Sequence, residues 1–354
     1  MLTEPRLGFL ICARNEAAII AATLDNLRAA DPPPDVVMVL ADHCADATAD
    51  IAEQAGARVF RRESGQAENK GLALRWLFEQ WPPALAQCQV IVIVDADSRV
   101  APDFVAQARH AAMSGVRVGQ CFVQPADLTT APSAQLSAYS DSLTQAVEAR
   151  FNQWWGWPVR LRGMGMLFEP QLLRELLPFV HTRSAEDIEL GLLSVERGLK
   201  IHFVPQAVLY DPKPPDARRA TRQRARWVTG LFQVWKDYAA LIGRLALRGP
   251  HLWWWLQTML FRPATLLITL KALAWALSLI FPAPPWARVG LGLWVSADVL
   301  YYMAGLLLIP QPERWRYAQV LWRAPLYLVM WVVGLVLAWR TPHRWLSVRH
   351  DNSP

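Results

Sequence analysis

The sequence has little charge for its length. Only 19% of its 354 residues are Asp, Glu, Lys or Arg, whereas a typical soluble domain carries about 25%. Basic residues outnumber acidic ones, and the formal net charge is +6. No motif of a nucleic-acid-binding domain accompanies this balance, so we exclude nucleic acid as a partner. We interpret the basic bias as that of a membrane protein whose loops lie in the cytoplasm.

Cysteine is also scarce, with four residues and no C-x-x-C pair. This spacing favours neither a zinc site nor a disulfide framework, so we expect reduced cysteines on the cytoplasmic side of a membrane. The first residues lack the pattern of a secretory signal, and no signal peptide is expected. Tryptophan, in contrast, is frequent, with 18 residues. Its rings suit both a membrane interface and stacking against flat apolar ligand faces, and composition leaves both uses open.

The first 125 residues or so alternate between short apolar runs and helix-like stretches. The runs are rich in β-branched residues, as in strands buried on both faces, and cover 7–12, 36–41 and 90–94. Helices are predicted between them, over roughly 16–30, 46–55 and 67–80. This alternation predicts an α/β fold with a mostly parallel sheet and flanking helices. Ligands of such sheets bind at the carboxyl ends of the strands, so the polar residues there are the ones to consider.

The pattern is more mixed after residue 125. We expect helices at about 132–150 and 186–197, and strands near 160–168 and 201–205. A basic stretch then follows over 217–245, and its amphipathic pattern is typical of a helix that lies on an anionic membrane surface.

Three apolar segments occupy the C-terminal part, at 263–281, 289–309 and 324–339. The first two are long enough to span about 30 Å of hydrocarbon as helices, and the third is marginal. In a hairpin of the first two, Lys271 and Asp298 would lie at similar depth. Charges inside a bilayer are costly unless they are paired. Two interpretations stay open: the two residues form a buried ion pair, or one of them snorkels to the lipid headgroups or contacts the preceding domain.

Several carboxylates follow the predicted strands. Asp95 and Asp97 come directly after the run 90–94 and form a hard-oxygen pair suited to Mg²⁺ or Mn²⁺, although a simple strand-end turn has the same pattern. Asp42 and Glu16 follow the two other runs. Asp187 begins the helix of 186–197, where it is either part of a helix cap or a general base.

A further cluster lies on the basic stretch. Gln223, Arg226 and Trp227 are spaced so that they share one helical face. Arginine binds a diphosphate through two hydrogen bonds, and tryptophan stacks on a sugar ring. An ordinary membrane-surface helix explains these residues equally well when they are considered alone.

The order of these motifs resembles glycosyltransferase family 2 with the GT-A fold, in particular the branch of cellulose, chitin and hyaluronan synthases. The resemblance covers residues 7 to about 230. It rests on seven motifs in the family's order: ICARNE, ADHCADAT, NKGLAL, DADS, RGMGM, SAEDIEL and QRARW. Two positions depart from the family pattern, because Ala41 replaces the first of two adjacent aspartates and Ala185 replaces a threonine.

The resemblance implies roles for particular residues. Asp187 would be the catalytic base, and Asp97, helped by Asp95, would bind the Mg²⁺ or Mn²⁺ ion. The expected substrate-binding residues are Ala13, Glu16, Asp42, Lys70, Asp95, Gly163, Gly165, Glu186, Gln223, Arg226 and Trp227. Among them, Lys70 would lie near the phosphates, and Gly163 and Gly165 belong to the acceptor loop.

From this resemblance we expect an inverting transfer of a sugar from a nucleotide-sugar, with a uridine nucleotide, to a saccharide or lipid-linked acceptor. The expected place is the cytoplasmic face of the inner cell membrane, in polysaccharide or glycolipid synthesis, with a multi-pass anchor. The expected division is a catalytic domain (1–211), a helical region with QRARW (212–256), a membrane region of two or three helices (257–341) and a tail (342–354). The alternatives are a polyprenyl-phosphate glycosyltransferase and a non-catalytic assembly subunit.

Overall fold

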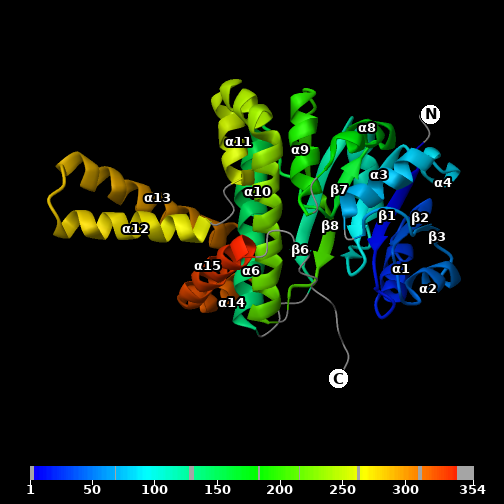
Figure 1. Ribbon diagram of the computed structural model, residues 1–354, viewed down its shortest axis with the longest axis horizontal. Helices are drawn as coiled ribbons and strands as arrows, with labels where there is room; N and C mark the ends of the chain where they lie inside the picture. The colour runs from blue at the N-terminus through cyan, green and yellow to red at the C-terminus, as the bar shows by residue number, and fades with distance from the viewer. Residues whose placement is uncertain are drawn as a thin grey trace.

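A computed structural model describes residues 4–67, 69–126, 131–181, 184–214, 216–260, 264–309 and 313–340. Its centre is an eight-stranded mixed sheet with the strand order β3-β2-β1-β4-β7-β6-β8-β5. Helices flank this sheet, and a helical layer on one side carries a long two-helix hairpin (Figure 1). The α/β expectation is thereby confirmed. The expected tail, 342–354, lies outside the described residues.

The N-terminal half of the sheet is parallel. Its strands are β1 (Leu7–Ala13), β2 (Val36–Asp42), β3 (Arg58–Arg62) and β4 (Val90–Asp95). Its helices are α1 (Ile20–Arg28), α2 (Thr48–Gln54), α3 (Lys70–Gln80) and the short α4 (Pro83–Ala86). The central strands β1 and β4 are buried on both faces, which explains their unbroken apolar runs. The edge strand β3 was not predicted, because its sequence RVFRR is largely charged.

The C-terminal half departs from a purely parallel order. The strand β7 (Met166–Phe168) runs antiparallel between β4 and β6 (Val118–Pro125). The strand β8 (Ile201–Asp211) is parallel to β6, and β5 (Arg99–Val100) pairs antiparallel with the end of β8. The helices of this half are α5 (Phe104–Met113), α8 (Pro170–Leu176), the 3-10 turn η2 (Leu177–Phe179) and α9 (Glu186–Glu196).

Two predicted strands differ in length from the observed ones. The strand expected near 160–168 is shortened to β7, because Gly163 and Gly165 adopt the positive φ angles of +83° and +62°, which break an extended strand. The strand expected at 201–205 continues to Asp211 as β8. This extension places Asp211 at the carboxyl edge of the sheet.

The helical layer consists mainly of α6, α10, α11 and α15 (Figure 1). The stretch expected as one helix over 132–150 comprises α6 (Pro132–Leu143), the π-helical turn η1 (Thr144–Ala149) and α7 (Arg150–Trp154). The basic stretch forms α10 (Ala217–Leu247), which is followed by α11 (Pro250–Leu260). The third apolar segment forms α15 (Ala324–Arg340), which follows α14 (Glu313–Val320) and the 3-10 turn η3 (Leu321–Arg323).

The helix α15 packs along α10 within the protein. At this contact the buried Arg224 guanidinium lies 4.5 Å from the ring centre of Tyr327 and 5.5 Å from that of Trp331. Its Nη2 atom also donates to Ser137 Oγ over 2.7 Å. Cation–π contacts and hydrogen bonds therefore hold this buried charge between α6, α10 and α15.

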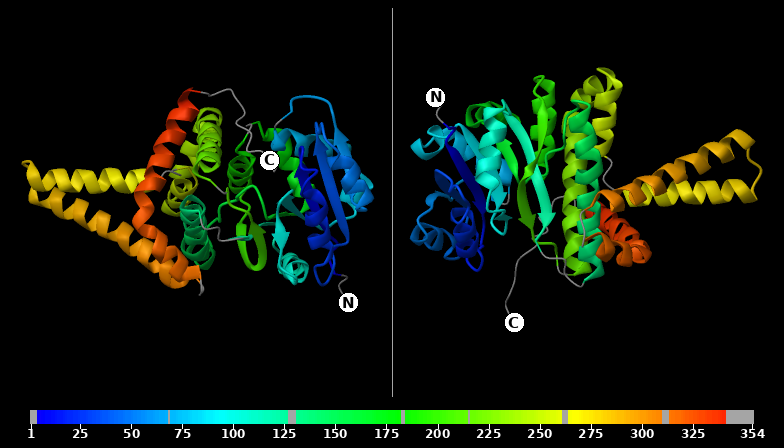
Figure 2. Two further views of the ribbon diagram at one scale, coloured as in Figure 1. Left: turned by 90° about the horizontal axis from the view of Figure 1, so that it is seen from below. Right: turned by 180° about the vertical axis from the view of Figure 1, so that it is seen from behind.

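The hairpin projects from the helical layer (Figures 1 and 2). It consists of α12 (Ala264–Ile280) and α13 (Pro285–Leu308). Within the described residues, α13 alone is long and apolar enough to cross a membrane, and α12 is a shorter apolar helix. The segments Arg314–Arg323 and Pro325–Arg340 are long and apolar enough to cross a membrane only when they are taken together, and the pair is bent by 67°. The structure therefore does not show the two or three spanning helices that we expected.

The two charges of the hairpin are paired. Lys271 Nζ lies 2.9 Å from Asp298 Oδ2, and it also lies 4.4 Å from the ring centre of Trp294. Of the two interpretations left open by the sequence, the ion pair is the correct one. At its inner end, α13 is fixed to η1 and α6, because Tyr301 Oη donates to Glu148 Oε1 over 2.7 Å and Tyr139 Oη donates to the Tyr302 carbonyl over 2.5 Å.

We predict that the Lys271–Asp298 pair behaves as a unit. Lys271→Leu alone leaves a carboxylate without its partner in an apolar hairpin, so it should lower the free energy of unfolding in detergent micelles. The double variant with Asp298→Leu removes both charges and should recover stability, with a coupling energy of about 0.5–3 kcal/mol. A double variant that loses the sum of the two single losses would contradict the pairing.

We also predict opposite effects for two glycines of α10. A Cβ atom at Gly230 would lie 2.8 Å from Ser184 Oγ and 2.9 Å from the Ser184 carbonyl oxygen, whereas one at Gly243 meets nothing within 4 Å. Gly230→Ala should therefore push α10 away from the start of α9 and cost about 1–3 kcal/mol. The matched control Gly243→Ala should stabilise the helix by roughly 0.5–1 kcal/mol. Thermal unfolding of both variants tests this, and equal effects would refute the close packing.

Candidate active site

The first candidate residues lie where β1 and β2 end. Ala13 is the last residue of β1, and its carbonyl accepts a weak hydrogen bond from Cys44 Sγ over 3.6 Å. Asn15 adopts a φ of +57°, which lets its Oδ1 accept from the Ala45 backbone over 2.7 Å. Glu16 donates its backbone N–H to Thr48 Oγ1 over 2.8 Å. These bonds tie the two loops into one edge of the sheet.

Asp42 is buried at the end of β2 and already has partners. Its Oδ1 accepts from Arg62 Nη1 and lies 2.8 Å from His43 Nδ1. Arg62 stands directly opposite Asp42 in the β2–β3 register. Sequence reasoning missed Arg62, because its relation to Asp42 depends on that register. Asp42 is thus held by a buried guanidinium.

Lys70 occupies the centre of the site. Its Nζ atom donates to Asp95 Oδ1 over 2.6 Å and to the Gly163 carbonyl over 2.7 Å. Lys70 is the first residue of α3, and Asn69 caps that helix by accepting from the Leu72 backbone over 2.9 Å. A capped helix start presents N–H groups and a positive dipole, both of which favour an anion. One ammonium group therefore joins β4, α3 and the loop of residues 162–166.

The loop of residues 162–166 is fixed by backbone bonds to both neighbouring strands. Gly165 donates its N–H to the Ile93 carbonyl over 2.8 Å, and its own carbonyl accepts from the Cys121 N–H over 2.8 Å. Gly163 has no side chain, and a Cβ atom built at this position would lie 3.8 Å from Glu186 Oε1. These glycines bring the backbone close to the acidic residues at the start of α9.

Glu186 and Asp187 open α9, and both are buried. Burial raises the pKa of Glu186 to about 7; the positive charge of Lys70 opposes this shift, and the negative charge of Asp187 adds to it. Burial also disfavours the charge on Lys70, but the carboxylates of Asp95 and Glu186 outweigh it and raise the pKa of Lys70. Acidic groups from β4 and α9 thus act on the same ammonium.

The start of α9 does not form the side-chain cap that was one of the two interpretations of Asp187. The N-cap of α9 is Ala185, without a side-chain bond, and Ser184 Oγ instead donates to the Arg226 carbonyl of α10 over 3.2 Å. Burial lowers the pKa of Arg226, while Glu186 and Asp95 act in the opposite direction. Arg226 therefore lies within the electrostatic reach of both acids.

The remaining residues of the QRARW motif point to different neighbours. Gln223 is half-buried on α10, one turn before Arg226. Trp227 is half-buried and packs against the cluster that α10 forms with α15, which includes Val228 and Trp331. Arg226 therefore interacts with the acidic residues of the site, whereas Trp227 packs within the helical layer.

Asp95 and Asp97 supply hard oxygen atoms at the end of β4. Both are half-buried, and one of the Asp95 oxygens is occupied by Lys70. No group of three or more acidic, histidine or cysteine side chains in the described part of the chain is arranged to hold a metal ion. Mg²⁺ is commonly bound by one or two carboxylates together with substrate phosphates and water. The pair fits a cation that arrives with a diphosphate.

A further acid, Asp211, approaches this pair from β8. The β5–β8 register sets Arg99 opposite Tyr210, which brings Asp211 beside the turn of residues 96–98. Burial raises the pKa of Asp211 to about 6; Lys213, 2.7 Å away, opposes this shift, and Asp97 adds to it. Sequence reasoning missed Asp211, because the expected strand ended at residue 205.

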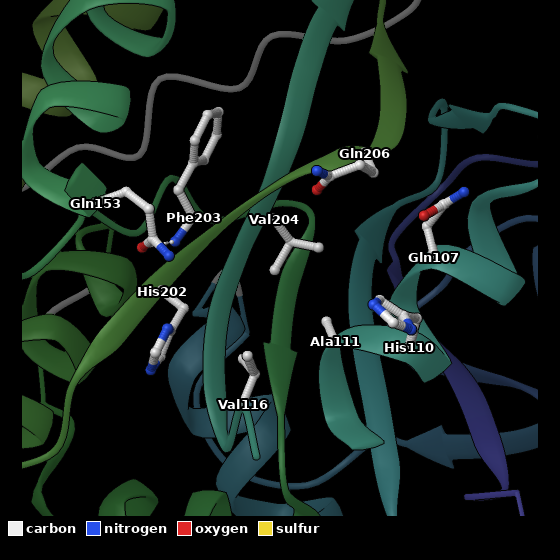
Figure 3. Close-up of a pocket in the computed structure, with 9 residues that line it drawn as sticks. All are labelled: Gln107, His110, Ala111, Val116, Gln153, His202, Phe203, Val204 and Gln206. Atoms are coloured by element: carbon white, nitrogen blue, oxygen red, sulfur yellow. Dashed lines mark hydrogen bonds between the residues drawn. The ribbon is translucent and has the colours of Figure 1, made fainter. Parts of the chain in front are cut away.

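A cavity of about 370 Å³ lies elsewhere on the sheet. Figure 3 shows its lining, which includes Gln107, Gln153, His202 and Gln206. Its β8 residues lie in the first part of that strand, whereas Asp211 is the last residue of the strand. This cavity is therefore distinct from the cluster around Lys70.

Comparison with known proteins agrees with this architecture. The chain is similar in structure to a mannosyltransferase from Pyrobaculum calidifontis in complex with GDP-Man and Mn²⁺, with a TM-score of 0.57, 19% identity, and coverage of 96% of this chain and 88% of that one. It also matches glucosyl-3-phosphoglycerate synthase from Mycobacterium tuberculosis, with a TM-score of 0.43, 23% identity, and coverage of 64% and 78%. The second score is too low to support an argument.

At these identities the first match shows the fold alone. No curated protein sequence matches the chain. The family model described as "Glycosyltransferase like family 2" matches residues 5–230, which is more than half of the chain. That range contains the sheet, α3, α9 and the first part of α10. The chain therefore belongs to glycosyltransferase family 2, and it is a glycosyltransferase with a GT-A-like fold.

Proposed function

We propose that this enzyme transfers a sugar, with inversion, from a nucleoside-diphosphate sugar to a saccharide or lipid-linked acceptor at the cytoplasmic face of a membrane. The observation that carries the proposal is the position of Lys70. Its ammonium group lies 2.6 Å from Asp95 Oδ1 and 2.7 Å from the Gly163 carbonyl. It therefore connects the proposed cation-binding residues with the proposed acceptor loop.

The donor would lie across the carboxyl edge of the sheet. Its nucleoside would bind beside Ala13, Glu16 and Asp42, and its diphosphate would lie near Lys70 and the start of α3. Asp97 and Asp95 would hold the Mg²⁺ or Mn²⁺ ion, which supplies charge neutralisation to the leaving diphosphate. Arg226 would add a second cationic group. The fold neighbour with GDP-Man and Mn²⁺ supports a nucleoside-diphosphate sugar; we expect a uridine nucleotide here.

The acceptor would enter beside Gly163, Gly165 and Glu186, with Gln223 and Trp227 at its far end. In this proposal Asp187 removes the proton from the acceptor hydroxyl, which attacks the anomeric carbon from the side opposite the diphosphate. One displacement inverts that carbon. The position of Asp187 in the first turn of α9 supports this role, because its carboxylate is buried and acts on that of Glu186, which in turn interacts with Lys70.

A membrane location is supported by the hairpin. The surface of α12 and α13 is mostly apolar and is exposed in the protein alone. Only 11% of the most apolar 18-residue stretch of α13 is buried inside the protein. Lipid is the medium in which such a surface is stable. We therefore propose a catalytic region over 1–211, a connecting region over 212–256 and a membrane region over 257–341. Their place in polysaccharide or glycolipid synthesis, as in the cellulose, chitin and hyaluronan synthase branch, belongs to the same proposal.

We predict that Asp187→Asn separates binding from transfer. The variant keeps the size of the side chain but loses the base, so transfer to a neutral hydroxyl acceptor should fall roughly 10²–10⁴-fold. Donor binding, measured by calorimetry, should change little. The exposed Asp237→Asn on α10 serves as the control. Full activity of Asp187→Asn with a polyprenyl phosphate would instead favour that acceptor, because it is already an anion.

We also predict a strict need for a divalent cation. Removing it with EDTA should lower transfer by roughly 100-fold or more, because the leaving diphosphate loses its main charge stabilisation. Adding Mg²⁺ or Mn²⁺ should restore activity in a screen of uridine and guanosine diphosphate sugars, with product analysis by mass spectrometry. Asp97→Asn should raise the cation concentration needed, whereas the exposed Asp25→Asn should not. Unchanged turnover in EDTA would refute the assigned role of Asp97.

A further inference from the structure

A cluster of exposed aromatic rings lies where α7 meets α11. We call it the aromatic patch, and it consists of Phe151, Trp154, Trp155, Trp253 and Trp254, which are between 39% and 81% exposed. The ring centres of Trp154 and Trp155 are 5.4 Å apart, and those of Phe151 and Trp254 are 6.5 Å apart. Rings from two helices thus form one continuous apolar surface. Large exposed apolar surfaces mark interaction sites.

The packing of α11 separates this surface from the protein core. Trp255 and Leu256 face inward and are buried, whereas the two preceding tryptophans are exposed. The core therefore accounts for one face of α11 only. The exposed rings are not needed to fill the interior, and another medium has to cover them.

The charges around the patch are basic. The sequences of α7 and α11, RFNQW and PHLWWWLQTML, contain Arg150 and His251 and no acidic residue. Arg248 precedes α11, and Lys200 Nζ lies 3.7 Å from the place where a Cβ atom of Gly156 would be. Aromatic rings with basic neighbours suit the headgroup region of a bilayer that contains anionic lipids.

The patch also lies close to the root of the hairpin. The helix α11 ends at Leu260, and α12 begins at Ala264. Six residues separate Trp254 from Leu260, which is about 9 Å along a helix axis. Figure 1 shows α11 on the side of α10 from which the hairpin projects, and α11 runs across the direction of the hairpin. A hairpin inserted in a bilayer would bring this helix to the bilayer surface.

We infer that the aromatic patch is a second membrane contact, which lies at the headgroup level while the hairpin enters the hydrocarbon. The inference rests on the proposed membrane location. It replaces α10 as the main interfacial element, since α10 packs against α15. Five exposed rings lie together on α7 and α11, whereas the exposed rings of α10 are Phe232 and Trp235. The two contacts together hold the long axis of α11 along the membrane plane, and they fix the direction in which the sheet faces the bilayer.

The test uses the full-length protein in nanodiscs of phosphatidylcholine and phosphatidylglycerol. One photoactivatable phosphatidylcholine carries its diazirine at the headgroup, and another carries it at the end of an acyl chain. Mass spectrometry then maps the labelled residues. We expect the headgroup probe to label Trp154, Trp155, Trp253 and Trp254, and the chain-end probe to label α12 and α13 instead. Met113 on α5, which is 56% exposed, is the reference for nonspecific labelling.

A pair of substitutions makes the test specific. Trp154→Ala with Trp254→Ala should reduce headgroup labelling of the turn around Arg248 several-fold, with labelling of the hairpin unchanged. The matched control is Trp322→Ala, a 72% exposed tryptophan on η3. Thermal unfolding checks that each variant folds. If the double variant does not fold, headgroup labelling of Trp155 is measured in the single variant Trp254→Ala instead.

The outcomes separate the inference from the proposed function. Labelling of the hairpin by the chain-end probe, with no more label on the patch than on Met113, would overturn the inference and leave the membrane anchor standing. Absence of label at both places would overturn both. Protection of the patch by a soluble oligosaccharide, without headgroup labelling, would identify a saccharide-binding surface and would also overturn the inference.

Discussion

The ammonium group of Lys70 is the interaction on which the candidate site depends. Asp95 and Glu186 bring two carboxylates near it, and Asp187 adds a third beside Glu186. Like charges that meet in a buried place disfavour ionisation. The pKa of Glu186, which burial raises to about 7, shows how little further negative charge the site tolerates. Lys70 and Arg226 offset part of that charge. The remainder favours a divalent cation, which explains why a cation and an anionic donor would bind together rather than singly.

The sequence predicted the parts of the fold that depend on local pattern. Unbroken apolar runs identified β1, β2 and β4. The distance of each charge from the hairpin turn placed Lys271 and Asp298 at similar depth, and of the two interpretations left open the structure shows the ion pair, at 2.9 Å. Parts that depend on register were not predictable. The contact of Arg62 with Asp42 follows from the β2–β3 alignment. The position of Asp211 follows from a register shift, in which residues 205–207 of β8 are inserted between the partners of Cys121 and Phe122 and the strand continues past its expected end.

The two arginines of the QRARW motif show how one helix joins two regions. Arg226 acts toward the acids, while Arg224 lies two residues earlier and packs between Tyr327 and Trp331 of α15. Two residues along a helix differ by about 200° in direction, so the two guanidinium groups leave α10 on nearly opposite sides. The helix α10 therefore contacts α15 on one side and the acidic residues of the candidate site on the other.

The π-helical turn η1 makes a similar connection, between the sheet and the hairpin. Gln145 bonds both backbone groups of Val123 in β6, at 2.7 and 2.8 Å, and Glu148 of the same turn accepts from Tyr301 of the hairpin at 2.7 Å. A π-helical turn widens the helix and rotates the side chains that follow it, which is how two residues three positions apart reach a strand on one side and α13 on another. One turn thus makes hydrogen bonds to both the sheet and the hairpin. If the hairpin enters a bilayer, η1 joins the membrane-inserted part of the chain directly to the sheet that carries the candidate site.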